Sequence, residues 1–159
     1  MVVNPCNGIT CFNGGICTSG QCICASGWTG NFCEQQSTTL GMRITSVTIN
    51  AIPALNAWDG STGPDVYINL SGNGIDKTSS TLWDIESFNL PLLFISIFPT
   101  TLSQPSATYS LTIYDEDAIT DDGMLGLSIT PTSLDSGWPA TIVYDQDGWD
   151  IVIAVEWIF

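Results

Sequence analysis

All six cysteines of this 159-residue chain lie between Cys6 and Cys33, in the spacing C-x4-C-x5-C-x4-C-x-C-x8-C, and the rest of the sequence has none. A segment this short cannot build an adequate apolar core, so disulfides must stabilise it. Disulfides persist in oxidising compartments. The sequence therefore predicts an exported protein in which a small disulfide module precedes a cysteine-free domain.

Zinc binding is the alternative use of clustered cysteines, and the sequence argues against it. The chain contains no histidine, and it lacks the two CxxC clusters that structural zinc sites carry. Six cysteines can still pair in several ways, so the spacing alone leaves the connectivity open.

The amino-terminal segment resembles the epidermal-growth-factor-like (EGF-like) family. The resemblance rests on the closing run Cys22–Cys33, C-I-C-A-S-G-W-T-G-N-F-C, and on the turn Asn13-Gly14-Gly15. It covers about residues 4–34, and we assign residues 1–35 to the module and residues 36–41 to a linker. The module has no carboxylate before Cys6, where calcium-binding members of the family carry one, so we expect a spacer or recognition unit. The resemblance implies the pairs Cys6–Cys17, Cys11–Cys22 and Cys24–Cys33.

Residues 42–159 alternate between apolar and polar side chains, which is typical of half-buried strands. The last segment is the clearest, because Ile151, Ile153 and Val155 share one face. The alternation slips near Thr45-Ser46, which indicates a bulge. Asp147-Gly148 suits a tight hairpin turn. We predict a mainly β protein whose second domain is an eight-stranded antiparallel β-sandwich.

Two apolar segments carry more specific expectations. The continuous run Leu92–Phe98 predicts a strand that is covered on both faces. The apolar end Val155–Phe159 predicts an exposed strand edge, which could pair with a neighbouring molecule.

Aspartates gather where predicted strands begin and end. Asp59 and Asp65 flank a Gly/Pro turn before one strand, and the run Asp115–Asp122 follows another strand with four aspartates in eight residues, Asp115, Asp117, Asp121 and Asp122. Aspartate is common in turns, where its side chain bonds nearby amides. Two loops that both carry such pairs instead favour a hard cation bound by oxygen, and calcium is the expected ion.

This domain resembles the C2 family, an eight-stranded sandwich with calcium-binding loops at one end. The matching segments occur in the family's order: Asp59-x5-Asp65-Val-Tyr67, Trp83–Phe88 (W-D-I-E-S-F) and Leu111–Gly126. The resemblance implies Asp59, Asp65, Asp115 and Asp117 as calcium ligands. The family's fifth aspartate falls on Gly123, and we expect the adjacent Asp121 or Asp122 to replace it, which leaves one or two ions.

The charge balance limits the partners. The chain has 16 acidic residues, two basic residues and a formal net charge of −14. It lacks the basic side chains that nucleic acid or an anionic lipid surface would require. The sequence contains no apolar run of about 18 residues, so it does not predict a transmembrane helix.

The leading functional hypothesis is a non-catalytic, calcium-binding module outside the cell, secreted or held at the surface by lipid upstream of this chain, which contacts a protein or surface ligand in adhesion. The first alternative is calcium-dependent phospholipid binding, with Ala118-Ile119 as the apolar loop tip. The second is a structural subunit that forms homo-oligomers. An enzyme is not expected, because the chain has no histidine and no recognisable nucleophile motif.

Overall fold

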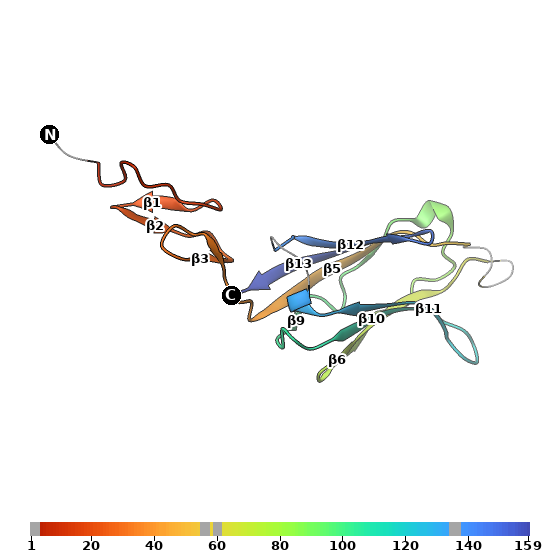
Figure 1. Cartoon of the computed structure of the whole chain (residues 1–159). Helices are drawn as coiled ribbons and strands as arrows, with labels where there is room; N and C mark the ends of the chain where they lie inside the picture. Colours follow the sequence, from red (N-terminus) through yellow and green to blue (C-terminus); the bar gives the residue numbers. More distant parts are fainter. Residues whose placement is uncertain (1–3, 55–57, 59–61, 134–137) are drawn as a thin grey trace.

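The computed structural model describes residues 4–54, 58, 62–133 and 138–159. The chain forms an amino-terminal module joined to a larger two-layered sandwich, and the two lie end to end (Figure 1). No α-helix occurs in the described ranges, so none there could cross a membrane.

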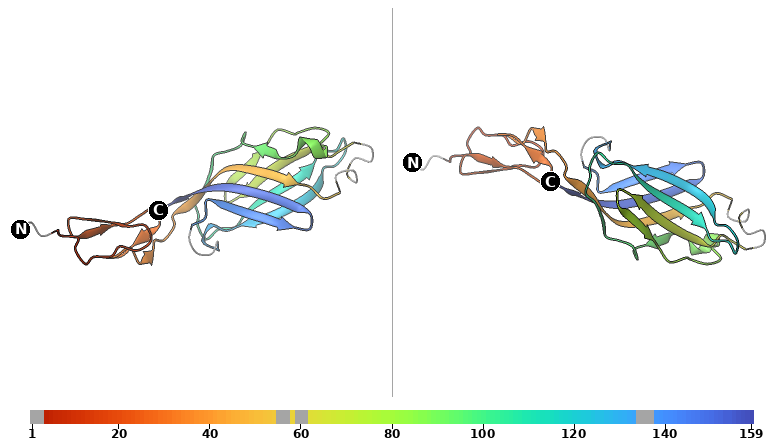
Figure 2. Two further views of the ribbon diagram at one scale, coloured as in Figure 1. Left: turned by 90° about the horizontal axis from the view of Figure 1, so that it is seen from above. Right: turned by 90° about the horizontal axis from the view of Figure 1, so that it is seen from below.

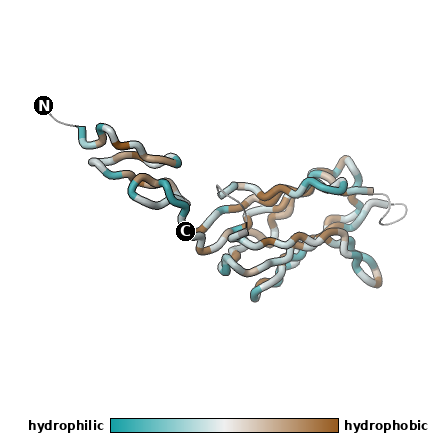
Figure 3. The backbone as a smooth tube through the Cα atoms, viewed as in Figure 1, coloured by the Kyte–Doolittle hydropathy of each residue, from teal (hydrophilic) through white to brown (hydrophobic). Residues whose placement is uncertain are grey.

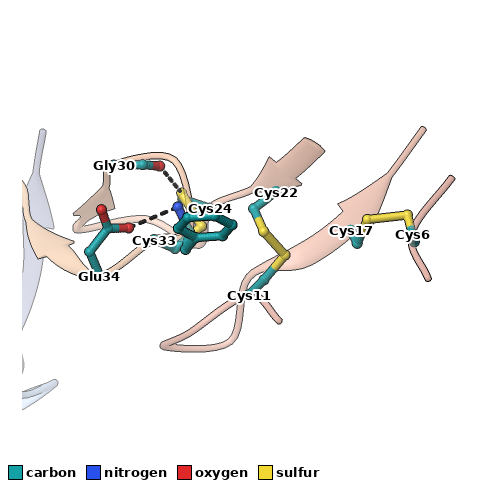
Figure 4. The surroundings of a disulfide bond; sticks show 9 residues. Cys6, Cys11, Cys17, Cys22, Cys24, Gly30, Cys33 and Glu34 are labelled. Atoms are coloured by element: carbon teal, nitrogen blue, oxygen red, sulfur yellow. Dashed lines mark hydrogen bonds between the residues drawn. A yellow bond between two sulfur atoms is a disulfide. The ribbon is translucent and has the colours of Figure 1, made fainter. Parts of the chain in front are cut away.

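The amino-terminal module consists of two short antiparallel hairpins. β1 (Ile16–Thr18) pairs with β2 (Gln21–Ile23), and β3 (Trp28–Thr29) pairs with β4 (Gln35–Gln36). Three disulfides follow one another along the module (Figure 4). They join the pairs that the EGF-like resemblance implies, Cys6–Cys17, Cys11–Cys22 and Cys24–Cys33.

The sandwich consists of two antiparallel sheets that face each other (Figure 2). The first sheet has the order β11 (Asp122–Ile129), β10 (Tyr109–Asp115), β6 (Val66–Gly72) and β7 (Ile75–Thr78). The second has the order β12 (Thr141–Gln146), β13 (Trp149–Ile158), β5 (Gly41–Ala51) and β8 (Leu92–Phe94), and β9 (Thr100–Leu102) also pairs with β5. Two short 3-10 turns, Ser87–Asn89 and Pro131–Ser133, complete the elements.

The predicted antiparallel sandwich is confirmed. β8 and β9 contact successive parts of β5, so they share one edge position, and the described strands occupy eight positions in the two sheets. The core lies between the sheets, where alternate residues of each strand are buried; Figure 3 shows these apolar positions recurring along the strands. Ile68, Ile113 and Ile151 are among the fully buried side chains.

Two local predictions are also confirmed. The register between β13 and β5 shifts at Ala154/Val155, opposite Ser46 and Ile44, so Thr45 is the extra residue of a bulge. Asp147 and Gly148 form the two-residue turn between β12 and β13, and both have positive φ, 53° and 84°, as a type I′ turn requires.

Of two other local predictions, one is wrong and one is confirmed only for the end of its strand. The run Leu92–Phe98 yields only the short edge strand β8, in which Leu93 is exposed, because proline at positions 91 and 99 cannot donate to a strand ladder. The last strand, β13, is not an edge over most of its length, because Asp150–Ala154 pair with both β12 and β5. Past the bond from the backbone N–H of Val155 to the carbonyl of Ala140, the described residues 156–158 continue on β5 alone, so the predicted edge is confined to this end.

The junction between the module and the sandwich is built on aromatic side chains. Trp138 makes edge-to-face contacts with Trp157 and Phe159, with ring centroids 5.0 and 4.9 Å apart. The indole N–H of Trp138 donates a hydrogen bond of 3.1 Å to the carbonyl of Gly27 in the module. Trp138 of the sandwich therefore bonds the module while its own ring is packed between Trp157 and Phe159.

Candidate metal centre at the distal loops

The end of the sandwich opposite the amino-terminal module is formed by loops, and we call it the distal end (Figures 1 and 2). It contains residues 62–65, which lead into β6, residues 82–90, and residues 116–121, which connect β10 to β11. Five of the six aspartates predicted as ligands lie within the described ranges, and all five are on these loops or the adjoining strand ends. Asp59 lies outside the described residues.

Asp65 and Asp115 are directly linked. The backbone N–H of Asp65 donates to Oδ1 of Asp115 at 2.7 Å, and the backbone N–H of Glu116 donates to the carbonyl of Asp65 at 2.8 Å. Asp115 is the last residue of β10 and is only 1% exposed, so its carboxylate belongs to the inner side of the sheet. Because β6 and β10 are neighbours in the sheet, the two aspartates are brought together by strand pairing.

A third loop contributes to the same cluster. Oδ1 of Asp65 accepts a hydrogen bond of 2.6 Å from the backbone N–H of Asp84, which fixes the carboxylate against residues 82–90. Asp122 is the Cα partner of Asp115 across the β10–β11 ladder and is exposed. Like charges that face each other directly across strands are destabilising, and a bound cation would relieve this repulsion.

The carboxylate of Asp121 points to the outer face of the first sheet. Its Oδ2 accepts a hydrogen bond of 2.7 Å from the hydroxyl of Tyr67, and its Oδ1 accepts one of 3.2 Å from the backbone N–H of Asp117. Tyr67 is on the outer face of β6, so the structure separates the carboxylate of Asp121 from that of the inward Asp115. Burial and the bond to Asp121 raise the pKa of Tyr67 well above its usual value.

The donor set fits calcium in chemistry, since it consists of carboxylate oxygens only. Asp65 and Asp115 are the two predicted ligands that the structure brings together. Among the described residues, no group of three or more acidic side chains is arranged to hold a metal ion. Asp117 is exposed on the same loop as Asp121.

The distal end also exposes large apolar side chains, two of which the sequence analysis did not predict to be exposed. Trp83 is 62% exposed and Phe88 is 83% exposed, both within residues 82–90. Ile119, which the sequence predicted as an apolar loop tip, is 97% exposed at the tip of the β10–β11 loop. A sequence signal for the first two was available, because they are large aromatic residues at the two ends of a short and mostly polar segment, W-D-I-E-S-F.

Comparison with known proteins places the fold. No family model and no curated protein matches the sequence. Solved structures do match: a C2 domain (15% identity, TM-score 0.53, covering 75% of this chain and 98% of that chain) and the calcium-bound pair of C2 domains of extended synaptotagmin 2 (17%, 0.52, 76% and 46%). Human GIVD cytosolic phospholipase A2 matches at 20% identity and TM-score 0.51 over 77% of this chain and 16% of its own.

These similarities establish a C2-like β-sandwich as the fold of the larger domain. The chain spans nearly the whole of the single C2 domain but only a small fraction of the phospholipase chain. The three disulfides beside it are typical of an oxidising, extracellular environment.

Proposed function

We propose that this protein is a non-catalytic, calcium-binding contact module that works outside the cell, as a secreted or surface-held protein. Calcium would bind at the distal end, between Asp59, Asp65, Asp115 and Asp117, and order the loops that meet the partner. The observation that supports this most directly is the hydrogen-bonded link between Asp65 and Asp115. It holds the carboxylate of Asp115 against the backbone of Asp65, so two acidic residues from distant segments meet at the end of a fold shared with a calcium-bound neighbour.

Calcium would act here as a constant structural ligand. Extracellular calcium sites typically have dissociation constants of roughly 10⁻⁴–10⁻³ M, and the ion is continuously available at such concentrations. Binding would also reduce repulsion in a chain of net charge −14. Asp122, opposite Asp115, would serve a second ion.

The proposed function is non-catalytic. The chain has no histidine, and all cysteines in the described ranges are in disulfides. The acidic side chains would act by binding calcium, and the bound ion would order the surface of the loops.

The calcium proposal is tested by thermal unfolding of the whole chain in 10 mM calcium and in chelator. A ligand of Kd about 1 mM would add about 1.4 kcal/mol to the free energy of unfolding at this concentration. For a chain of this size that corresponds to a rise in Tm of roughly 3–6 °C. The variant Asp115→Asn with Asp117→Asn should lose this rise.

The matched control is Asp145→Asn with Asp147→Asn, which removes two carboxylates at the same spacing from the β12–β13 hairpin. It should keep the calcium response of the wild type. An equal response to calcium in all three proteins, or none in any, would refute the assignment of the site.

A second candidate function is calcium-dependent binding to a phospholipid membrane. The exposed Trp83, Phe88 and Ile119 at the distal end favour it, because apolar loop tips next to a cation site can enter the lipid interface. Both basic residues have partners in the fold: Arg43 pairs with Glu156 at 3.3 Å, and Lys77 donates to Thr100 at 2.9 Å. A zwitterionic surface is therefore the expected lipid.

Cosedimentation with phosphatidylcholine vesicles distinguishes the two functions. The membrane function requires pelleting that depends on calcium and is lost in Trp83→Ser with Ile119→Ser. Absence of pelleting, together with a normal calcium effect on Tm, would refute membrane binding and leave a protein partner.

A further inference from the structure

A cavity opens where the outer face of the first sheet meets the distal end. Its volume is about 410 Å³, and its lining comes from β6, β7, β10 and the β10–β11 loop. It lies on the opposite side of the sheet from Asp115, whose side chain is buried. It is therefore distinct from the candidate calcium centre.

Two stacked tyrosines are part of the lining of this cavity. Tyr67 and Tyr114 are Cα partners across β6 and β10, and their rings are nearly parallel, with centroids 5.0 Å apart and planes 13° apart. The bond from the Tyr67 hydroxyl to Asp121 fixes the pair further. The cavity therefore has a rigid aromatic surface that is preformed.

Several of the hydrogen-bond donors around the cavity are used within the protein. The hydroxyl of Tyr67 donates to Asp121, and that of Thr81 donates to Glu116. The amide nitrogen of Asn69 donates to Asp76 at 2.9 Å and to Thr78 at 3.0 Å.

The acceptor capacity around the cavity, by contrast, is only partly used. A carboxylate offers about four lone-pair sites, and the bonds above occupy one site on Glu116 and two on Asp121, counting the backbone donor from Asp117. The side-chain carbonyl of Asn69 is a further acceptor. A ligand that brings donors therefore fits these free acceptor sites.

The charge of the cavity selects the same kind of ligand. Glu116 and Asp121 are both in the lining, and no lysine or arginine is among the described lining residues. Lys77, the neighbour of Thr78 on β7, donates instead to Thr100 and to the carbonyl of Ile97. The net charge of −14 adds a long-range attraction for cations.

We propose that this cavity binds the guanidinium group of an arginine side chain from a partner protein. A planar guanidinium stacks on tyrosine rings and offers five N–H donors, with two carboxylates within the same lining. A lysine ammonium carries the charge without the plane. A neutral sugar carries no charge to match the two carboxylates. This inference goes beyond the proposed function, because it names the partner chemistry of a second surface that needs no calcium.

The test is an NMR titration of the ¹⁵N-labelled whole chain in chelator, so that the candidate calcium centre does not contribute. The probes are blocked pentapeptides, Gly-Gly-X-Gly-Gly, in which X is arginine, lysine or citrulline. Citrulline keeps the planar shape and removes the charge. A fourth probe, methyl glucoside, tests for a sugar site.

The arginine peptide should shift the backbone amides of Tyr67, Asn69, Thr78 and Tyr114. Its affinity should fall roughly 10-fold in the isosteric variant Glu116→Gln with Asp121→Asn, because each partly exposed ion pair contributes a few-fold. Asp145→Asn with Asp147→Asn makes the same change of net charge outside the cavity, and should leave the affinity unchanged.

Several results would overturn the proposal. Equal affinity for arginine and citrulline would exclude a charge-selective site, and equal affinity for lysine would exclude a role for the guanidinium plane. Shifts with methyl glucoside alone would identify a sugar site instead. Because the probe comparison uses the wild type, it decides the question even where the double variant folds poorly.

Discussion

Replacing Gly27 with alanine tests whether the aromatic junction fixes the module to the sandwich. A Cβ at this position would lie 2.6 Å from Cδ1 and 2.8 Å from Nε1 of Trp138, and 2.9 Å from Cζ of Phe159. Real Cβ atoms do not approach other heavy atoms this closely, so one side must move. Trp138 cannot easily yield, because it packs against Trp157 and Phe159. The module should therefore be displaced.

The magnitude follows from the contacts that displacement breaks. The hydrogen bond from Trp138 to the carbonyl of Gly27 is worth about 1 kcal/mol. Loss of the packed aromatic contact adds roughly another 1 kcal/mol. Together they shift the ratio of docked to undocked module by roughly 30-fold.

Gly8→Ala is the matched control. Gly8 has φ +82°, close to the φ +85° of Gly27, but an added Cβ there meets nothing within 4 Å. Both variants therefore carry the cost of a side chain at positive φ, roughly 1 kcal/mol, and only Gly27→Ala also disturbs the junction.

¹⁵N relaxation measures the outcome. When the module is docked, its amides and those of the sandwich share one rotational correlation time. In Gly27→Ala the module amides should relax as a smaller, faster body, while Gly8→Ala should behave as the wild type. Common tumbling in Gly27→Ala, with an unchanged indole N–H shift for Trp138, would refute the role assigned to this junction.

Two further predictions concern the sandwich. A Cβ on Gly63 would clash with the carbonyl oxygen of Ile85, so Gly63→Ala should lower the free energy of unfolding by about 2 kcal/mol or more in denaturant titration. Gly126→Ala, with open space around it, should lower it by about 1 kcal/mol or less. The pKa of Tyr67 is raised in the folded protein, so its contribution to stability is present below its usual pKa of about 10 and is lost as pH rises through the folded value. The free energy of unfolding should therefore fall in strong alkali. In Asp121→Asn, phenolate absorbance should report a lower pKa for Tyr67 that still lies above the usual value, because burial is the larger cause of the shift.

The strand pattern was predictable from the sequence because its causes are local. Alternation of apolar residues identified the faces of β13, a slip in that alternation located the bulge at Thr45, and Asp147-Gly148 identified the hairpin turn. Each depends on a backbone preference of a few neighbouring residues.

The wrong and missing predictions concern pairing between distant segments. How much of Val155–Phe159 forms an edge depends on where β12 pairs. The signal that β8 lies at a sheet edge is in the prolines at 91 and 99 that flank the apolar run, which the prediction from the run alone did not use. The stacking of Tyr67 on Tyr114 requires the register of β6 against β10. The bond that draws Asp121 to Tyr67 follows from that register, and no spacing in the sequence encodes it.

Successive side chains at the end of β10 lie on opposite faces of the sheet, Tyr114 on the outer face and Asp115 on the inner face. Asp121 accepts one hydrogen bond from Tyr67 and one from the backbone of Asp117, so it connects the outer cavity with the loop of the candidate metal centre. A ligand on one face that turned this carboxylate would change what the other face can bind. Linkage makes such an effect reciprocal: whatever factor the cation imposes on the affinity for guanidinium, guanidinium imposes on the affinity for the cation.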